Sequence, residues 1–80
     1  METLEKVISI ITEIKESNLN VTPETKLGED LGIDSFDTIM IITAIEDEYS
    51  IEINGSDLEK IITVDDIVKL LNGKYLKNSE

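Results

Sequence analysis

In residues 3–16, apolar side chains recur with the spacing of a helix. Glutamate, lysine and threonine lie between apolar side chains that recur every three or four positions, at Leu4, Val7, Ile8, Ile11 and Ile14. This spacing places the apolar side chains on one face of an amphipathic helix. We therefore expect a helix over residues 3–16, ended by the polar cluster at 17–20.

A long connection follows the first predicted helix. Residues 17–34 include the only proline of the chain, Pro23, together with Gly28 and Gly32. Connections of this length are uncommon in small domains and often carry function. We predict a loop here, anchored to the core by four apolar side chains, Val21, Leu27, Leu31 and Ile33.

Residues 35–49 carry the pattern of a second helix. It is expected to begin at Ser35 or Phe36, with Asp34 or Ser35 as its N-cap, since both side chains can accept a hydrogen bond from a free backbone N–H. With about 100° per residue, the predicted core face consists of Ile42, Ile45 and Tyr49, with Ile39 and Ile41 at its margins.

The opposite face of this second helix is also apolar. Phe36 and Met40 lie there, in line with Thr43 and Asp47. A helix that buries one stripe does not need apolar side chains on both faces. Two interpretations remain open: Phe36 packs under the long loop while Met40 fills a gap, or both belong to an exposed contact face with an acidic rim.

The last third of the chain completes a helical pattern. Residues 50–55 alternate like a strand but have no partner strand, so we predict a loop, followed by a short helical turn at 56–61. Thr63 and Asp66 have capping-box spacing and open a last helix that Asn72-Gly73 is expected to stop. Residues 74–80 are expected to fray. The predicted fold is all-α: one domain over residues 1–80, a small bundle of three main helices plus one short helix, with a long loop between the first two.

Charge narrows the classes of partner. The 80 residues hold 18 acidic and 7 basic side chains, for a formal net charge of −11. This balance argues against nucleic acid and against an anionic membrane surface, and it favours basic protein partners. The chain has no cysteine, no signal-peptide pattern and no apolar run of about 20 residues that would span a bilayer. We expect a cytoplasmic protein, a monomer, with no metal site of its own.

Ser35 is the side chain best placed to carry chemistry. A nucleophilic serine needs a neighbouring base, yet the chain has no histidine and no Gly-x-Ser-x-Gly turn. The nearest lysine in sequence is Lys26. We therefore expect no enzyme active site, and a serine that is either a helix cap or a site modified by another enzyme. Calcium binding is disfavoured because the acidic residues do not form an EF-hand loop.

The segment Asp30-Leu31-Gly32-Ile33-Asp34-Ser35-Phe36-Asp37-Thr38-Ile39 resembles the attachment motif of acyl carrier proteins, D-L-G-x-D-S-L-x-x-V. The similarity extends over nearly the whole chain. It implies that Ser35, with Asp34 as its motif neighbour, carries 4′-phosphopantetheine that a magnesium-dependent phosphopantetheinyl transferase takes from coenzyme A. The thiol of this arm would hold acyl groups as thioesters. The resemblance also implies a face for basic surfaces of acyl-handling enzymes, formed by Phe36, Asp37, Ile39, Met40, Thr43, Glu46 and Asp47.

Two positions depart from the motif and its surroundings. Phe36 stands in place of the usual leucine, and Met40 in place of a usual glutamate on the partner face. The lost charge argues against recognition by the general fatty-acid enzymes and indicates a carrier for one specialised pathway, for a polyketide, a lipopeptide or a modified lipid. The resemblance by itself leaves a fatty-acid pathway open as well. Carriers of aminoacyl, aryl or D-alanyl groups remain an alternative. So does an unmodified acidic helical adaptor in which Ser35 only caps its helix.

Overall fold

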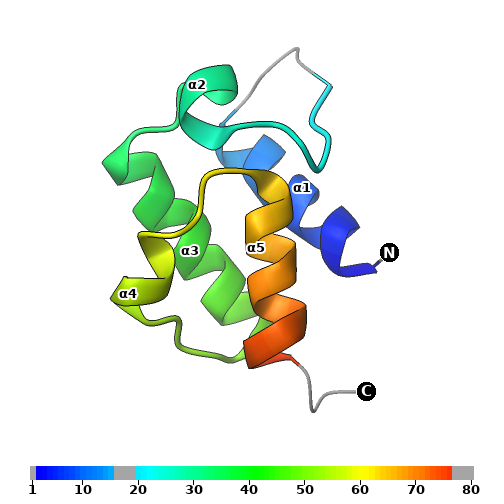
Figure 1. Cartoon of the computed structure of the whole chain (residues 1–80), viewed down its shortest axis with the longest axis vertical. Helices are drawn as coiled ribbons and strands as arrows, with labels where there is room; N and C mark the ends of the chain where they lie inside the picture. The colour runs from blue at the N-terminus through cyan, green and yellow to red at the C-terminus, as the bar shows by residue number, and fades with distance from the viewer. Residues whose placement is uncertain (1, 16–19, 77–80) are drawn as a thin grey trace.

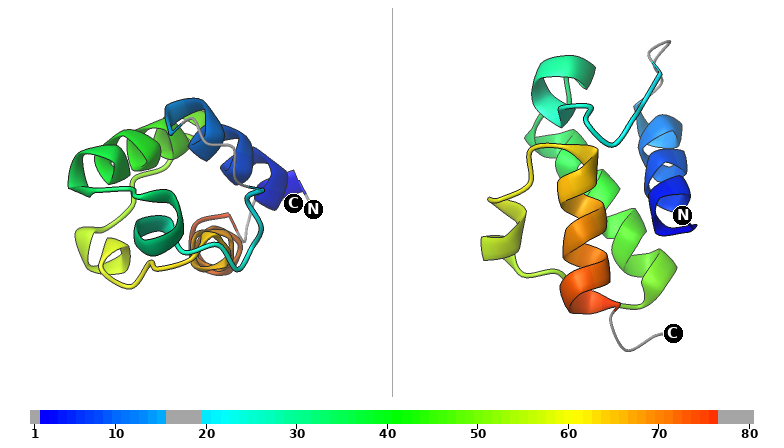
Figure 2. Two further views of the ribbon diagram at one scale, coloured as in Figure 1. Left: turned by 90° about the horizontal axis from the view of Figure 1, so that it is seen from above. Right: turned by 45° about the vertical axis from the view of Figure 1, so that its right-hand side comes forward.

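The computed structural model describes residues 2–15 and 20–76. Its elements are α1 (Glu2–Ile14), α2 (Leu27–Leu31), α3 (Ser35–Tyr49), α4 (Gly55–Leu58), α5 (Val64–Leu70) and the π-helical turn η1 (Leu71–Tyr75). α1 packs against both α3 and α5, and α2 lies across the end of the bundle where α3 and α5 begin (Figure 1). Seen from above, α4 lies on the side away from α1 (Figure 2). The predicted all-α bundle is confirmed.

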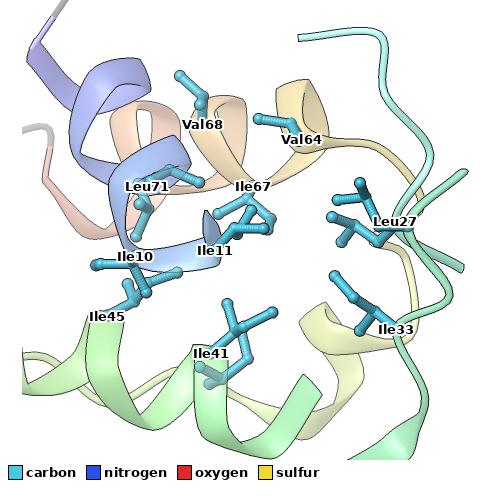
Figure 3. Close-up of a cluster of buried hydrophobic side chains, with 13 residues drawn as sticks. Ile10, Ile11, Leu27, Ile33, Ile41, Ile45, Val64, Ile67, Val68 and Leu71 are labelled. Carbon is cyan, nitrogen blue, oxygen red and sulfur yellow. The ribbon is translucent and has the colours of Figure 1, made fainter. Parts of the chain in front are cut away.

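The core is built from aliphatic side chains of the three main helices (Figure 3). The largest fully buried side chains come from α1, α3, α5 and η1: Val7, Ile11, Ile41, Ile45, Val64, Ile67 and Leu71. Leu27 and Leu31 of α2, and Ile33 after it, close the end of the core, while Val21 packs against it partly buried. The four predicted anchors of the long connection are therefore confirmed.

The predicted faces of α3 need one correction. Ile39 is 63% exposed, so its assignment to the margin of the core face is wrong, whereas Ile41 on the other margin is buried. Phe36 and Met40 are 69% and 40% exposed. Packing of Phe36 beneath the long connection is therefore wrong, and the exposed contact face is the interpretation that the structure supports.

The predicted continuous loop over 17–34 is wrong at α2, and residues 17–19 lie outside the described residues. Leu27 and Leu31 are one helical turn apart and both buried, so a single turn of helix seals the core at this point. The Asp30 carboxylate accepts a hydrogen bond from the Lys26 backbone N–H at 2.8 Å. Gly32 ends the turn in the left-handed conformation, with φ of 69°, which favours glycine.

The chain before α2 is hydrogen-bonded to the chain before α5. The backbone N–H of Leu27 donates to the carbonyl of Ile62 at 2.9 Å, and that of Val64 donates to the carbonyl of Thr25 at 3.0 Å. Lys26 and Thr63 form an isolated antiparallel bridge between these contacts. We call these two paired segments, 23–27 and 61–65, the backbone strap.

The predictions for the short helix and for the last helix are confirmed in part. Residues 51–54 are a loop, and the predicted turn at 56–61 is α4 followed by hydrogen-bonded turns to Ile61. The Thr63–Asp66 capping box is confirmed: the Thr63 hydroxyl accepts from the Asp66 N–H, and the Asp66 carboxylate accepts from the Thr63 N–H. The N–H groups of Thr63 and Ile62 hold the pKa of Asp66 below its ordinary value.

Two predicted helix ends differ from the structure. α1 ends at Ile14, and residue 16, where we expected the end, lies outside the described residues. Asn72-Gly73 does not stop the last helix, because η1 continues it to Tyr75, with the Leu76 N–H bonded to the Leu71 carbonyl at 2.6 Å. The predicted fraying is wrong for Lys74 and Tyr75, which make side-chain contacts with α4, and 77–80 are not described.

The charge of the chain predicts a dependence of stability on salt. With 18 acidic side chains against 7 basic ones, like charges repel within a small volume. We expect added sodium or magnesium chloride to screen this repulsion and to raise the melting temperature by roughly 4–8 °C. Thermal melts at low and high ionic strength, with the two salts matched in ionic strength, would measure it; a melting temperature that stays constant would contradict the expectation.

Candidate functional site: the start of helix α3

Ser35 is the first residue of α3 and is exposed to solvent. The N-cap is Asp34, whose carboxylate accepts a hydrogen bond from the Asp37 N–H at 2.9 Å. The Asp34 carbonyl also accepts from the Thr38 hydroxyl at 2.9 Å. Ser35 is therefore not the cap, and within residues 2–15 and 20–76 its hydroxyl takes part in no hydrogen bond.

The segment before α3 determines which side chains face solvent. Gly32 turns the chain out of α2, and the Ile33 N–H then bonds to the Leu27 carbonyl at 3.0 Å while the Ile33 side chain is buried. Asp34 and Ser35 follow directly and are exposed. The buried isoleucine thus anchors the chain, and the serine hydroxyl is presented at the surface.

The charges around Ser35 are partly balanced. The Asp37 N–H, and to a smaller extent the Lys15 ammonium, hold the pKa of Asp34 below its ordinary value despite partial desolvation. Lys15 Nζ, just after α1, lies 3.4 Å from the Asp37 carboxylate. Sequence reasoning missed Lys15, because only the packing of α1 against α3 brings it to this site.

In the part of the chain that the structure describes, no general base is hydrogen-bonded to the Ser35 hydroxyl. Lys15 pairs with Asp37, and Lys26 Nζ lies 3.6 Å from the Glu29 carboxylate. The chain has no histidine, and the described residues hold no cluster of metal-ligating side chains. Within residues 2–15 and 20–76, no side chain that could take up the Ser35 proton is hydrogen-bonded to its hydroxyl.

An apolar cavity opens beside this helix terminus. Its volume is about 340 Å³. Leu27 and Gly28 of α2 line one side, and the segment of α4 and its following turn lines another with Leu58, Ile61 and Ile62. From α3 come Ile41, Ile42 and Thr38, the last of which is one helical turn after Ser35 and so on the same face. A chain attached at Ser35 would begin one turn from the cavity lining.

The residues predicted to meet partners divide into two groups. Phe36, Ile39, Met40, Thr43 and Asp47 are exposed and follow one another at helical spacing along α3. Asp37 and Glu46 instead make internal contacts. Asp37 pairs with Lys15, and the Glu46 carboxylate accepts from the Ile53 N–H at 2.8 Å.

Known proteins identify the chain. A family model described as the phosphopantetheine attachment site matches residues 3–71. A curated acyl carrier protein from Thermosynechococcus vestitus is 38% identical over 74 residues, which cover 91% of each chain. The chain belongs to the acyl carrier protein family. The solved structure of a protein from Mycobacterium tuberculosis described as an acyl carrier protein superposes with a TM-score of 0.84 at 30% identity, covering 91% of this chain and 99% of that one.

Membership in the acyl carrier protein family establishes the cofactor and the class of activity. Such a protein carries covalently bound 4′-phosphopantetheine and is a carrier rather than an enzyme. The family works with a phosphopantetheinyl transferase and with acyl-handling enzymes. Among the described residues of this acyl carrier protein, no helix is both long and apolar enough to span a bilayer.

Proposed function

We propose that Ser35 is the attachment point of 4′-phosphopantetheine and that the chain delivers acyl thioesters between the enzymes of a fatty-acid pathway or a specialised polyketide or lipid pathway. The observation that carries this proposal is the Ser35 hydroxyl itself. It is exposed at the start of α3, makes no hydrogen bond among the described residues, and lies one turn from the lining of an apolar cavity.

The surroundings of Ser35 fit a phosphodiester. The start of α3 presents free backbone N–H groups and the positive end of the helix dipole. Asp34 and Asp37 oppose a further negative charge, but the first already accepts the Asp37 N–H and the second is paired with Lys15. The thiol of the bound arm supplies the thioester chemistry that a chain without cysteine lacks.

The cavity favours an aliphatic cargo. Most of its lining is isoleucine and leucine, with Thr38, Lys26 and Glu29 as its polar members. The Thr38 hydroxyl already donates to the Asp34 carbonyl, and Lys26 and Glu29 pair with each other. An acyl chain would exchange water for apolar contacts there, whereas the ammonium of an aminoacyl or D-alanyl group would lose its hydration. The acyl cargo is therefore preferred over these alternatives.

Mass spectrometry of the intact protein would test the attachment. We expect wild type incubated with coenzyme A, magnesium and a broad-specificity transferase to gain the mass of one phosphopantetheine. Ser56→Ala is a matched control, because Ser56 is also an exposed serine near the start of a helix and precedes an aspartate. The control should gain the same mass. A folded wild type that gains none with either of two transferases would overturn the proposal.

The exposed side of α3 is the proposed docking face for partner enzymes. Phe36, Ile39 and Met40 provide exposed apolar contact, and Asp47 provides a free carboxylate at the far end. Partners with basic surfaces around an apolar patch would complement it. The acidic charge and the absence of cysteine support action in the cytoplasm as a monomer.

Met40→Glu is expected to strengthen binding to general fatty-acid synthase enzymes. Met40 is 40% exposed, so a carboxylate there would reach a basic partner surface without disturbing the core. Since an exposed charge pair contributes up to about 1 kcal/mol, the gain should reach up to about fivefold in Kd. Calorimetric titration against such an enzyme would measure it, with Met40→Gln as the uncharged control; equal affinities for the two variants would refute the expectation.

A further inference from the structure

The only buried residue of α4 is a carboxylate. Asp57 is 7% exposed, whereas Gly55 and Ser56 are exposed and Leu58 is only partly buried. Burial of an ionised carboxylate is unfavourable unless charged or hydrogen-bonding partners compensate it. α4 is therefore attached to the bundle through a buried polar contact in addition to the packing of Leu58, whereas α1, α3 and α5 are held by aliphatic packing.

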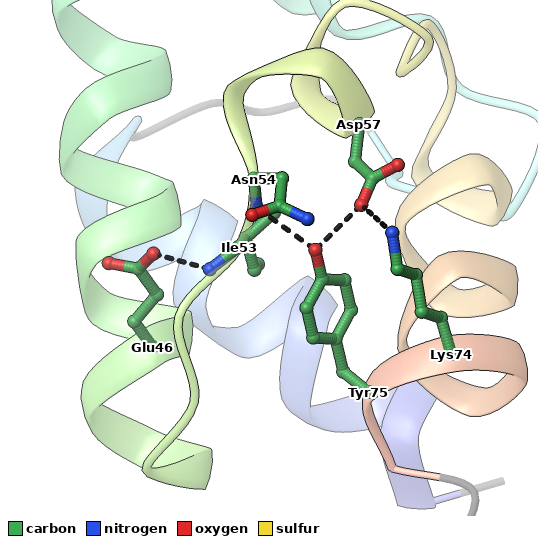
Figure 4. A network of polar contacts seen from close by, with 6 residues as sticks. All are labelled: Glu46, Ile53, Asn54, Asp57, Lys74 and Tyr75. Atoms are coloured by element: carbon green, nitrogen blue, oxygen red, sulfur yellow. Dashed lines mark hydrogen bonds and ion pairs between the residues drawn. The ribbon is translucent and has the colours of Figure 1, made fainter.

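The partners of Asp57 come from the π-helical turn at the other end of the chain (Figure 4). One carboxylate oxygen accepts from Lys74 Nζ at 2.8 Å and from the Tyr75 hydroxyl at 2.6 Å. The Tyr75 hydroxyl accepts in turn from the Asn54 N–H at 2.9 Å, and Lys74 Nζ lies 5.5 Å from the centre of the Tyr75 ring. We call Asp57, Lys74 and Tyr75 the α4 clamp.

The charges of the clamp reinforce each other. The hydrogen bond from Lys74, followed by that from Tyr75, holds the pKa of Asp57 below its ordinary value. The same contact raises the pKa of Lys74. Both groups are therefore charged at neutral pH, and the hydrogen bonds are of the stronger, charge-assisted kind.

The clamp and the cavity share one segment of chain. Leu58, directly after Asp57, lines the cavity, and so do Ile61 and Ile62 a few residues later. Upstream, the Ile53 N–H is held by the Glu46 carboxylate of α3 (Figure 4). The cavity wall is thus fastened to α3 on one side of α4 and to η1 at α4 itself.

We propose that Lys74 and Tyr75 are positioning residues that hold α4, through Asp57, as the wall of the acyl cavity. Neither residue lines the cavity, so they would act on the cargo by keeping Leu58, Ile61 and Ile62 in place. This inference rests on the proposed function, in which the cavity receives the acyl chain. The location of Lys74 and Tyr75 in a π-helical turn supports this role, because such turns are rare and often lie at functional sites.

Amide hydrogen exchange tests the clamp without any attached arm. In Tyr75→Phe and Lys74→Met, we expect the amides of Leu58 and Ile61 to exchange about tenfold faster than in wild type, because a charge-assisted hydrogen bond that resists local opening is lost. Lys69→Met is the matched control. It removes the same charge from the preceding helix and breaks the exposed pair with Asp65, at 3.1 Å, without touching the α4 clamp. Equal acceleration in α1 and α3, or none in α4, would overturn the proposal.

Loading of the arm with two cargoes tests the consequence for the cavity. The transferase is given acetyl- or octanoyl-coenzyme A, and the melting temperatures of the two loaded forms are compared within each variant. An acyl chain that is bound only in the folded state stabilises that state. The octanoyl form of wild type and of Lys69→Met should therefore melt at a higher temperature than the acetyl form.

In Tyr75→Phe and Lys74→Met, the difference in melting temperature between the octanoyl and acetyl forms should fall to less than about half of its wild-type value. A purely structural loss would lower the melting temperatures of both forms equally. The difference between them would then stay unchanged, and this result would overturn the proposal. Failure of Ser35 to accept any arm would instead contradict the proposed function, while the exchange of α4 amides would still decide whether the clamp holds the wall.

Discussion

Ser35→Ala is expected to abolish attachment of the phosphopantetheine arm while leaving the fold unchanged. The variant lacks the only oxygen at this position that can form the phosphodiester. Its stability should stay within about 0.5 kcal/mol of wild type, because the N-cap is Asp34 and the serine hydroxyl makes no hydrogen bond among the described residues. Intact mass after incubation with transferase, together with urea unfolding, would measure both quantities on the same samples.

The result separates the carrier from the adaptor interpretation. An adaptor in which Ser35 caps its helix would lose about 1 kcal/mol of stability in the alanine variant and would keep its partner binding. The structure already places the cap at Asp34. A mass gain in Ser35→Ala would locate the arm on another hydroxyl, and the attachment site proposed above would then be wrong.

Ile45→Ala is expected to destabilise the protein by about 2–5 kcal/mol, since truncating a buried isoleucine removes apolar contacts and leaves a cavity. Ile45 is fully buried in the centre of α3. Domains of this length are stable by only about 4–12 kcal/mol, so a substantial part of the variant could be unfolded at low ionic strength. Urea denaturation in the presence of salt would measure the loss.

Ile39→Ala is the matched control on the same helix. Ile39 is 63% exposed, and its truncation should change stability by no more than about 0.5 kcal/mol. Its effect should appear instead as weaker binding to partner enzymes, because it lies on the proposed docking face. If Ile39→Ala destabilised the fold as strongly as Ile45→Ala, the description of that side of α3 as a free surface would be wrong.

The main helices were predictable because their sequence signals are local. The apolar spacing of residues 4–14 and the Thr63–Asp66 pair each lie within a few turns and need no knowledge of distant chain. The position of Ser35 at a helix start follows in the same way from the Asp-Ser pair and the apolar pattern after it. Elements determined by short-range spacing can therefore be read from one sequence.

The missed features depend on contacts between distant residues. α2 is only five residues long and contains Gly28, so its local propensity is weak, and burial of Leu27 and Leu31 stabilises it. η1 continues through Gly73, where a local reading predicts a stop, because Lys74 and Tyr75 bind Asp57. The exposure of Ile39 was missed because a spacing of 100° per residue gives only the order of the side chains around α3. It does not show which of them the neighbouring helices cover.

The same distinction applies to the site. Ser35 and Asp34 were identified from their motif, whereas the Lys15–Asp37 pair and the internal role of Glu46 required the packed structure. Charged residues on one helix look equivalent in sequence. Only the position of α1, and of the loop at Ile53, distinguishes the carboxylates with internal partners from Asp47, which is exposed.

The backbone strap has a consequence for the order in which the molecule folds. Its hydrogen bonds join the chain before α2 to the chain before α5, so a large loop must close before they form, at a cost in chain entropy. The strap should therefore assemble late in folding and open early during native-state fluctuations. Leu27 and Ile62 belong both to the strap and to the cavity lining. Local opening of the backbone strap would therefore also open the cavity wall at Leu27 and Ile62, while the packing of α1 against α3 and α5 stays intact.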